Sequence, residues 1–174
     1  MEIKILKHPT DDDWMLCKQV ALATVGKDAA IPPDMEWKHK MLRAQHSPIR
    51  ILPFLFELRD IPYYVSVHLC RHVHSVPFVQ SQRNDRQSNY DRRKAPQDAP
   101  VTMCWYMSAE ELITIAHKRL CGKADPATRT VVQMMCDLVV KVNPEFERML
   151  VPMCEYTHEC YEMQSCGRWI ENGT

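Results

Sequence analysis

Residues 49–58 are dominated by isoleucine, leucine and phenylalanine, and this stretch constrains the fold most. An apolar, partly aromatic run of strand length predicts a buried strand, in which Pro53 marks a bulge or an edge. Such a strand needs other elements to cover it. The rest of the sequence predicts strands over 2–7 and 101–107, helices over about 11–25, 34–45, 108–120 and 126–142, and a last short helix beginning at 143–144.

We interpret this order of elements as an α+β fold, a small and mostly antiparallel sheet flanked by helices. A chain of 174 residues can bury one sizeable core, and 4 glycines against 12 prolines leave little flexible linker. We therefore expect a single catalytic-type domain over residues 1–151. A cysteine-rich tail over residues 152–174 is expected to pack on that domain.

Composition argues against several classes of protein. Hydrophobic residues make up 45% and charged residues 25% of the chain, and no apolar run approaches the roughly 18 residues that span a bilayer. The first residues alternate like a strand and lack a secretory signal, so we expect a cytoplasmic protein whose 8 cysteines stay reduced. The formal net charge of +0 argues against a general nucleic-acid binder.

Positive charge is nevertheless concentrated locally. Between residues 71 and 94, six basic side chains stand against two acids. Arginine presents a fork of donors that matches phosphate oxygens, so Arg71 and Arg83, with the hydroxyl of Ser81, predict a phosphate or nucleotide pocket. The alternative is a solvated basic face beside a core histidine. A helix is expected to start at residues 60–62, which would place His68, Arg71 and His72 on one face.

The spacing of this cluster resembles a known signature. Arg71-His72-Val73, seven residues, then Ser81 and Arg83 is similar to the Arg-His-Arg, seven residues, Ser, any residue, Arg signature of the flavin-dependent thymidylate synthases, and four of its five named positions match. The resemblance covers roughly residues 46–142. It includes His46-Ser47-Pro48 before the buried strand, Asp60-Ile61-Pro62 before the helix, and Arg119-Leu120-Cys121 with Ala124 and Arg129.

The resemblance implies a thymidylate synthase complementing protein-like fold and a homotetramer with active sites between subunits. It implies reductive methylation of dUMP at carbon 5 of the uracil, with FAD as cofactor and methylenetetrahydrofolate and NADPH as co-substrates. Arg119 would be catalytic, binding and polarising the base. The implied substrate-binding residues are His68, Arg71, Ser81, Gln82, Arg83 and Arg119, and the implied cofactor-binding residues are His46, Arg71, His72 and Val73.

This sequence also departs from the family pattern. Val73 replaces the second arginine of the signature, and His68 stands where the family usually has a glutamine. Ser108 and Glu110 occupy the positions of an asparagine and an arginine that usually help bind FAD. We favour a diverged, shortened member of phage type. The alternative is a nucleotide-binding homologue that lost FAD or acts on another pyrimidine nucleotide, with a metal-stabilised tail.

The tail contains a possible metal set. Cys154, Cys160 and Cys166 are evenly spaced, and His158 lies between the first two. Three thiolates and an imidazole suit tetrahedral zinc, and such soft ligands also accept iron. Cys121 would supply a fourth ligand if the tail folds back. The alternative is that these thiols bind no metal, because the set lacks the tight Cys-x2-4-Cys pair of most structural zinc sites.

Overall fold

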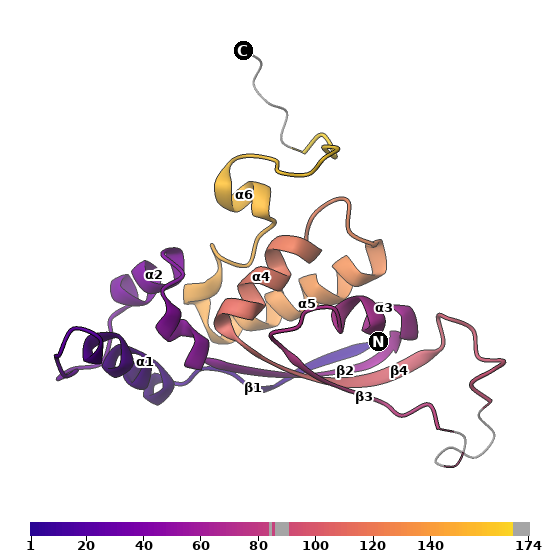
Figure 1. The fold of residues 1–174 in the computed structure, drawn as a ribbon, viewed down its shortest axis with the longest axis horizontal. Helices are drawn as coiled ribbons and strands as arrows, with labels where there is room; N and C mark the ends of the chain where they lie inside the picture. Colours follow the sequence, from indigo (N-terminus) through magenta and orange to yellow (C-terminus); the bar gives the residue numbers. More distant parts are fainter. Residues whose placement is uncertain (84, 86–90, 169–174) are drawn as a thin grey trace.

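The computed structural model describes residues 1–83, 85 and 91–168, and is shown in Figure 1. Within those residues, four strands form one sheet in the order β1-β2-β4-β3. Every pairing is antiparallel. The α+β prediction is confirmed. The strands are β1 (Glu2–Lys7), β2 (Pro53–Pro62), β3 (Val76–Val79) and β4 (Pro100–Ser108).

Helices α3, α4 and α5 lie on one side of the sheet, α1 and α2 lie beyond one of its ends, and α6 lies against α4 (Figure 1). In the described part of the chain, no helix is both long enough and apolar enough to span a bilayer. The helices are α1 (Asp11–Ala23), α2 (Met35–Arg43), α3 (Tyr63–Leu69), α4 (Ala109–Arg119), α5 (Pro126–Val142) and α6 (Met153–Thr157), with short 3-10 turns η1 (Ser47–Ile51) and η2 (Pro144–Phe146).

The buried strand is β2, and it lies between β1 and β4. Phe54 and Phe56 are fully buried, and Trp105 of β4 pairs with Phe56 across the ladder. The strand predicted over 49–58 is wrong at its start, because residues 47–51 form a 3-10 turn. Pro53 is the first residue of the strand, a position where its missing N–H costs no ladder hydrogen bond.

The end of β2 also differs from the sequence prediction. The strand passes through a register shift between Leu58 and Ile61, with Asp60 at a φ of 55°, and continues to Pro62. Helix α3 therefore begins at Tyr63 and ends at Leu69. The prediction that Arg71 and His72 share a helix face with His68 is wrong, since both residues follow the helix in a turn.

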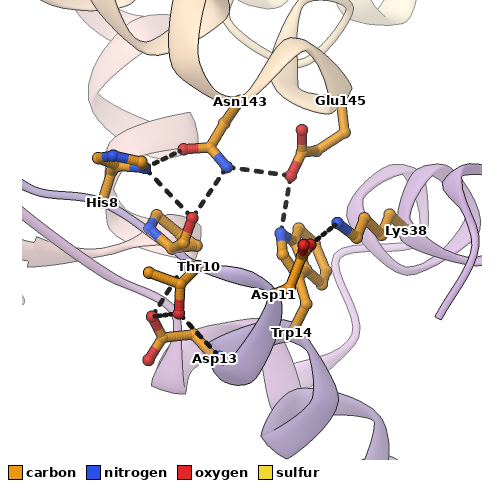
Figure 2. A network of polar contacts seen from close by, with 9 residues as sticks. His8, Thr10, Asp11, Asp13, Trp14, Lys38, Asn143 and Glu145 are labelled. Carbon is orange, nitrogen blue, oxygen red and sulfur yellow. Dashed lines mark hydrogen bonds and ion pairs between the residues drawn. The ribbon is translucent and has the colours of Figure 1, made fainter. Parts of the chain in front are cut away.

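A buried polar network ties the N-terminal segment to the end of α5 (Figure 2). The indole Nε1 of Trp14 donates to Glu145 Oε1 at 2.7 Å, and Asn143 Nδ2 donates to the same oxygen at 3.2 Å. Asn143 also donates to the carbonyl of Pro9 at 3.1 Å and bonds the ring of His8 at 2.9 Å. This network holds β1 and α1 against η2.

Candidate functional site

Arg119 ends α4 and is held by the turn that follows α3. Its Nε donates to His72 Nε2 at 2.9 Å, and its Nη2 donates to the carbonyl oxygen of His68 at 2.9 Å. The guanidinium is therefore fixed along one edge. Its Nη1 makes no hydrogen bond to any residue that the structure describes, so this side of the fork can serve a ligand.

Glu111 contacts the His72 ring at Nδ1, the nitrogen that does not face Arg119. Because His72 Nε2 accepts from Arg119, this assignment of hydrogen bonds places the ring proton on Nδ1. His72 Nδ1 lies 3.5 Å from Glu111 Oε1, and the two side chains are only 10% and 6% exposed. A buried carboxylate, an imidazole and a guanidinium thus follow one another in a chain.

The residues around Arg119 form an open, cationic pocket of about 370 Å³. Burial lowers the pKa of the Arg119 guanidinium, and the positive charge of Arg71 lowers that pKa further. Cations that repel one another in this way favour an anionic ligand. We call this the arginine pocket, and it is lined by Arg71, His72, Lys118, Arg119, Cys121, Lys123, Ala124 and Glu162.

The His68 side chain is directed to the start of α5. Its Nδ1 lies 3.0 Å from Thr128 Oγ1, and Thr128 donates both its backbone N–H and its hydroxyl to Asp125 Oδ2, at 2.8 and 2.9 Å. Its ring also packs edge-on against Tyr64, with centroids 5.7 Å apart. The side chain of His68 is therefore engaged with α5 and α3, and His68 contacts Arg119 through its backbone carbonyl.

Asp125→Ala is expected to destabilise the protein by about 1 kcal/mol, because α5 loses its N-cap. The backbone N–H of Thr128 is the main cause that lowers the Asp125 pKa. The carboxylate contribution is therefore complete above the ordinary aspartate pKa and is lost as pH falls through the lowered value. Urea unfolding of the wild type and of Asp125→Ala should show a difference in the free energy of unfolding at neutral pH, and this difference should shrink in acid. Asp125→Asn keeps a cap whose contribution is independent of pH, and an equal loss at both pH values would contradict this assignment.

The second half of the signature lies outside the arginine pocket. Ser81, Gln82 and Arg83 follow β3, in a segment that leads away from the helices (Figure 1). Arg83 forms a two-point ion pair with Asp85 at 2.9 and 2.7 Å, and its backbone N–H donates to Ser81 Oγ at 3.3 Å. One chain alone does not bring these residues to Arg119.

The predicted cofactor-binding residues are mostly at the surface. His46 is exposed and precedes η1, and Val73 is 80% exposed. Arg71 is exposed at the arginine pocket, whereas the ring of His72 is largely buried between Glu111 and Arg119. Glu111 was missed as a site residue, since in the sequence it is one half of a capping pattern with Ser108.

The metal set predicted from the tail is not assembled. In the structure of residues 1–83, 85 and 91–168, no group of three or more His, Cys, Asp or Glu side chains is placed so that it could hold a metal ion. His158 ends α6 in a left-handed conformation and lines a different pocket from the cysteines, beside Arg43 and Tyr156. Cys154, Cys160 and Cys166 instead line one small pocket with Cys121.

No protein-family profile and no curated protein matches this chain. Solved structures do match it. Thymidylate synthase X (ThyX) from Helicobacter pylori with FAD and dUMP superposes with a TM-score of 0.67 at 12% identity, covering 86% of this chain and 99% of that one. A second structure, flavin-dependent thymidylate synthase ThyX from Helicobacter pylori complexed with FAD and dUMP, gives 0.67 at 13% identity, with 86% and 98% covered. The chain shares the fold of these proteins.

Proposed function

We propose that this protein is a flavin-dependent thymidylate synthase-like enzyme that reductively methylates dUMP at carbon 5 of the uracil. The observation that carries the proposal is the arginine pocket, in which Arg119 is fixed by His72 and His68 and faces an excess of positive charge. The fold, shared with proteins crystallised with FAD and dUMP, supports the same function.

Arg119 is proposed to bind the base. Its Nε and Nη2 are held by the protein, so its position does not have to be established when the ligand arrives. A pre-oriented guanidinium stabilises negative charge that develops on a uracil carbonyl oxygen during attack at the neighbouring carbons. Glu111 is proposed as a positioning residue, which keeps the His72 ring turned so that its Nε2 accepts from Arg119.

Arg71 is proposed to bind a phosphate. It is exposed at the mouth of the arginine pocket and donates no hydrogen bond to another described residue. The phosphate of dUMP is further proposed to contact Ser81, Gln82 and Arg83 of a neighbouring subunit, in a homotetramer. In that arrangement Arg83 would exchange its exposed pairing with Asp85 for a doubly charged phosphate.

Some of the exposed residues at this site have the chemistry needed to bind FAD, and one does not. The donors of Arg71 suit the cofactor phosphates, and exposed His46 and Val73 suit a cofactor held on one subunit and covered by another. Val73 offers a surface for contact but no hydrogen-bond donor. Reductive methylation takes the new carbon from methylenetetrahydrofolate, and bound flavin, reduced by NADPH, supplies the electrons.

The second candidate function is a nucleotide-binding homologue that lost FAD or acts on another pyrimidine nucleotide. It is favoured by Val73, which removes a donor at a position that is 80% exposed. It is also favoured by Glu162, an acid that lines the otherwise cationic arginine pocket.

A paired binding experiment tests the two candidates. Isothermal titration with dUMP and flavin absorbance after incubation with FAD are measured on the same protein preparation. Saturable binding of both, followed by formation of dTMP when methylenetetrahydrofolate and NADPH are added, is the expected result. Binding of dUMP without FAD supports the second candidate, and binding of neither excludes both.

A further inference from the structure

Four cysteine side chains line one small pocket of about 50 Å³ between the end of α4 and the tail. Cys121 follows α4, Cys154 lies on α6, and Cys160 and Cys166 lie on the irregular segment beyond it. All four thiols are free. The sequence predicted a metal set of Cys154, His158, Cys160 and Cys166, with Cys121 as a fourth ligand if the tail folds back. In the structure Cys121 lines this pocket, whereas His158 lines another.

One contact shows how closely the two sides of this pocket approach, and a second, within one side, marks Cys121 Sγ as an acceptor. A Cβ atom added to Gly122 would lie 3.0 Å from Cys166 Sγ, so the tail cysteine packs directly on the backbone beside Cys121. The backbone N–H of Lys123 points at Cys121 Sγ, 3.5 Å away. Short N–H···S contacts of this kind accompany metal-bound thiolates and stabilise their charge.

The charges around the pocket are those of a thiolate site. Lys118 and Arg168 both line it, and Arg168 also pairs with Glu155 of α6. Cations beside a set of thiols favour the thiolate, which is the form that binds a metal.

We propose that Cys121, Cys154, Cys160 and Cys166 bind one zinc ion. Four thiolates at about 2.3 Å from the metal give the tetrahedral geometry of structural zinc sites. The four thiols line one pocket but do not form a ready-made metal site, so zinc binding requires the sulfurs to move inward, and each ligand releases its proton to solvent. The added positive charge relieves the repulsion among the ionised sulfurs.

A zinc ion here would explain what holds the tail in place. Residues 158–168 have no regular secondary structure, and all of them except Cys160 are exposed. A segment with so little burial needs a cross-link to stay ordered. Cys121 and Glu162 line both this pocket and the arginine pocket, so the ion would also fix the wall next to Arg119.

Metal content of the purified full-length protein tests the proposal. Protein from zinc-supplemented medium, purified without chelators, is expected to contain about one zinc per chain by elemental analysis. Cys121→Ser and Cys160→Ser are each expected to lose the zinc. Gly122→Ala should weaken its retention without removing a ligand, because the methyl group displaces Cys166, and Gly122 does not have a positive φ.

His158→Ala and Cys104→Ser are the matched controls, and both are expected to keep zinc. Limited proteolysis of the tail, which should accelerate on zinc loss, and thermal unfolding show whether a variant still folds. Zinc-free wild-type protein, iron in place of zinc, or a disulfide within the set found by mass spectrometry would overturn the proposal. So would zinc loss in His158→Ala with retention in Cys121→Ser. Zinc content and dUMP affinity are separate readouts, so failure of one does not imply failure of the other.

Discussion

Arg119→Ala is expected to abolish formation of dTMP and to weaken dUMP binding by about 2 kcal/mol, or about 30-fold. The protein holds this guanidinium at two of its nitrogens, and its Nη1 makes no hydrogen bond to a described residue, which leaves that nitrogen for the ligand. Removing it takes away a charged donor that is already in position. Turnover suffers more than binding, since charge on the base is largest in the transition state. Isothermal titration and a dTMP assay measure the two effects.

Two further variants distinguish the loss of the planar guanidinium from a loss of positive charge and from a general loss of folded protein. Arg119→Lys keeps the charge but not the planar fork, so it should recover part of the dUMP affinity and little of the turnover. Arg59→Ala removes an exposed arginine that pairs with Glu57 on β2, and should leave both unchanged. Undiminished methylation in Arg119→Ala would remove this residue from the proposed mechanism.

Elements with strong end signals were predicted well. Helix α5 occupies Pro126–Val142 as expected, because Pro126 suits the first turn and Asp125 caps it. Strand β1 covers the predicted residues 2–7. The helix predicted from Ser108 also begins there, since Ser108 accepts from the backbone N–H of Glu111. In each case local chemistry alone determines where the element starts.

Elements that depend on distant partners were missed. Strand β3 is four residues long and contains Pro77, so its sequence reads as a loop, and it exists because β4 pairs with it. Helix α6 is short and lies against α4. The α3 helix was placed too early, because pairing of Ile61 with Val101 extends β2. Sequence periodicity carries none of this tertiary information.

The candidate site shows the same division. The family resemblance pointed to Arg71, His72 and Arg119, and the structure gathers these three at one pocket. Glu111 escaped notice because its position in a capping pattern already explained it. Its burial beside His72 is visible only in the folded structure. Glu111 and Arg119 are eight residues apart on one helix, which places them about 80° apart around its axis, so helical spacing alone gave no signal for Glu111.

Trp14→Ala is expected to give the largest loss of stability, about 3–5 kcal/mol, a large part of the 5–15 kcal/mol that stabilises a typical domain. Trp14 is 1% exposed and packs against Phe146, with ring centroids 6.1 Å apart. It also supplies the shorter of the two hydrogen bonds to Glu145 in Figure 2. The substitution therefore opens a cavity and leaves a buried carboxyl group with one donor fewer. Urea and thermal unfolding followed by circular dichroism measure the loss.

Two further variants divide that loss between packing and hydrogen bonding. Trp14→Phe keeps an aromatic ring but removes the indole N–H, and should cost about 1–3 kcal/mol, because a buried acceptor loses its donor. Glu145→Gln retains an oxygen acceptor for Trp14 and should cost less than Trp14→Phe. Because the network joins α1 to η2 and lies outside the arginine pocket, the folded fraction of each variant should bind dUMP normally. A Trp14→Phe protein as stable as wild type would show that packing against Phe146 alone holds the N-terminal segment in place.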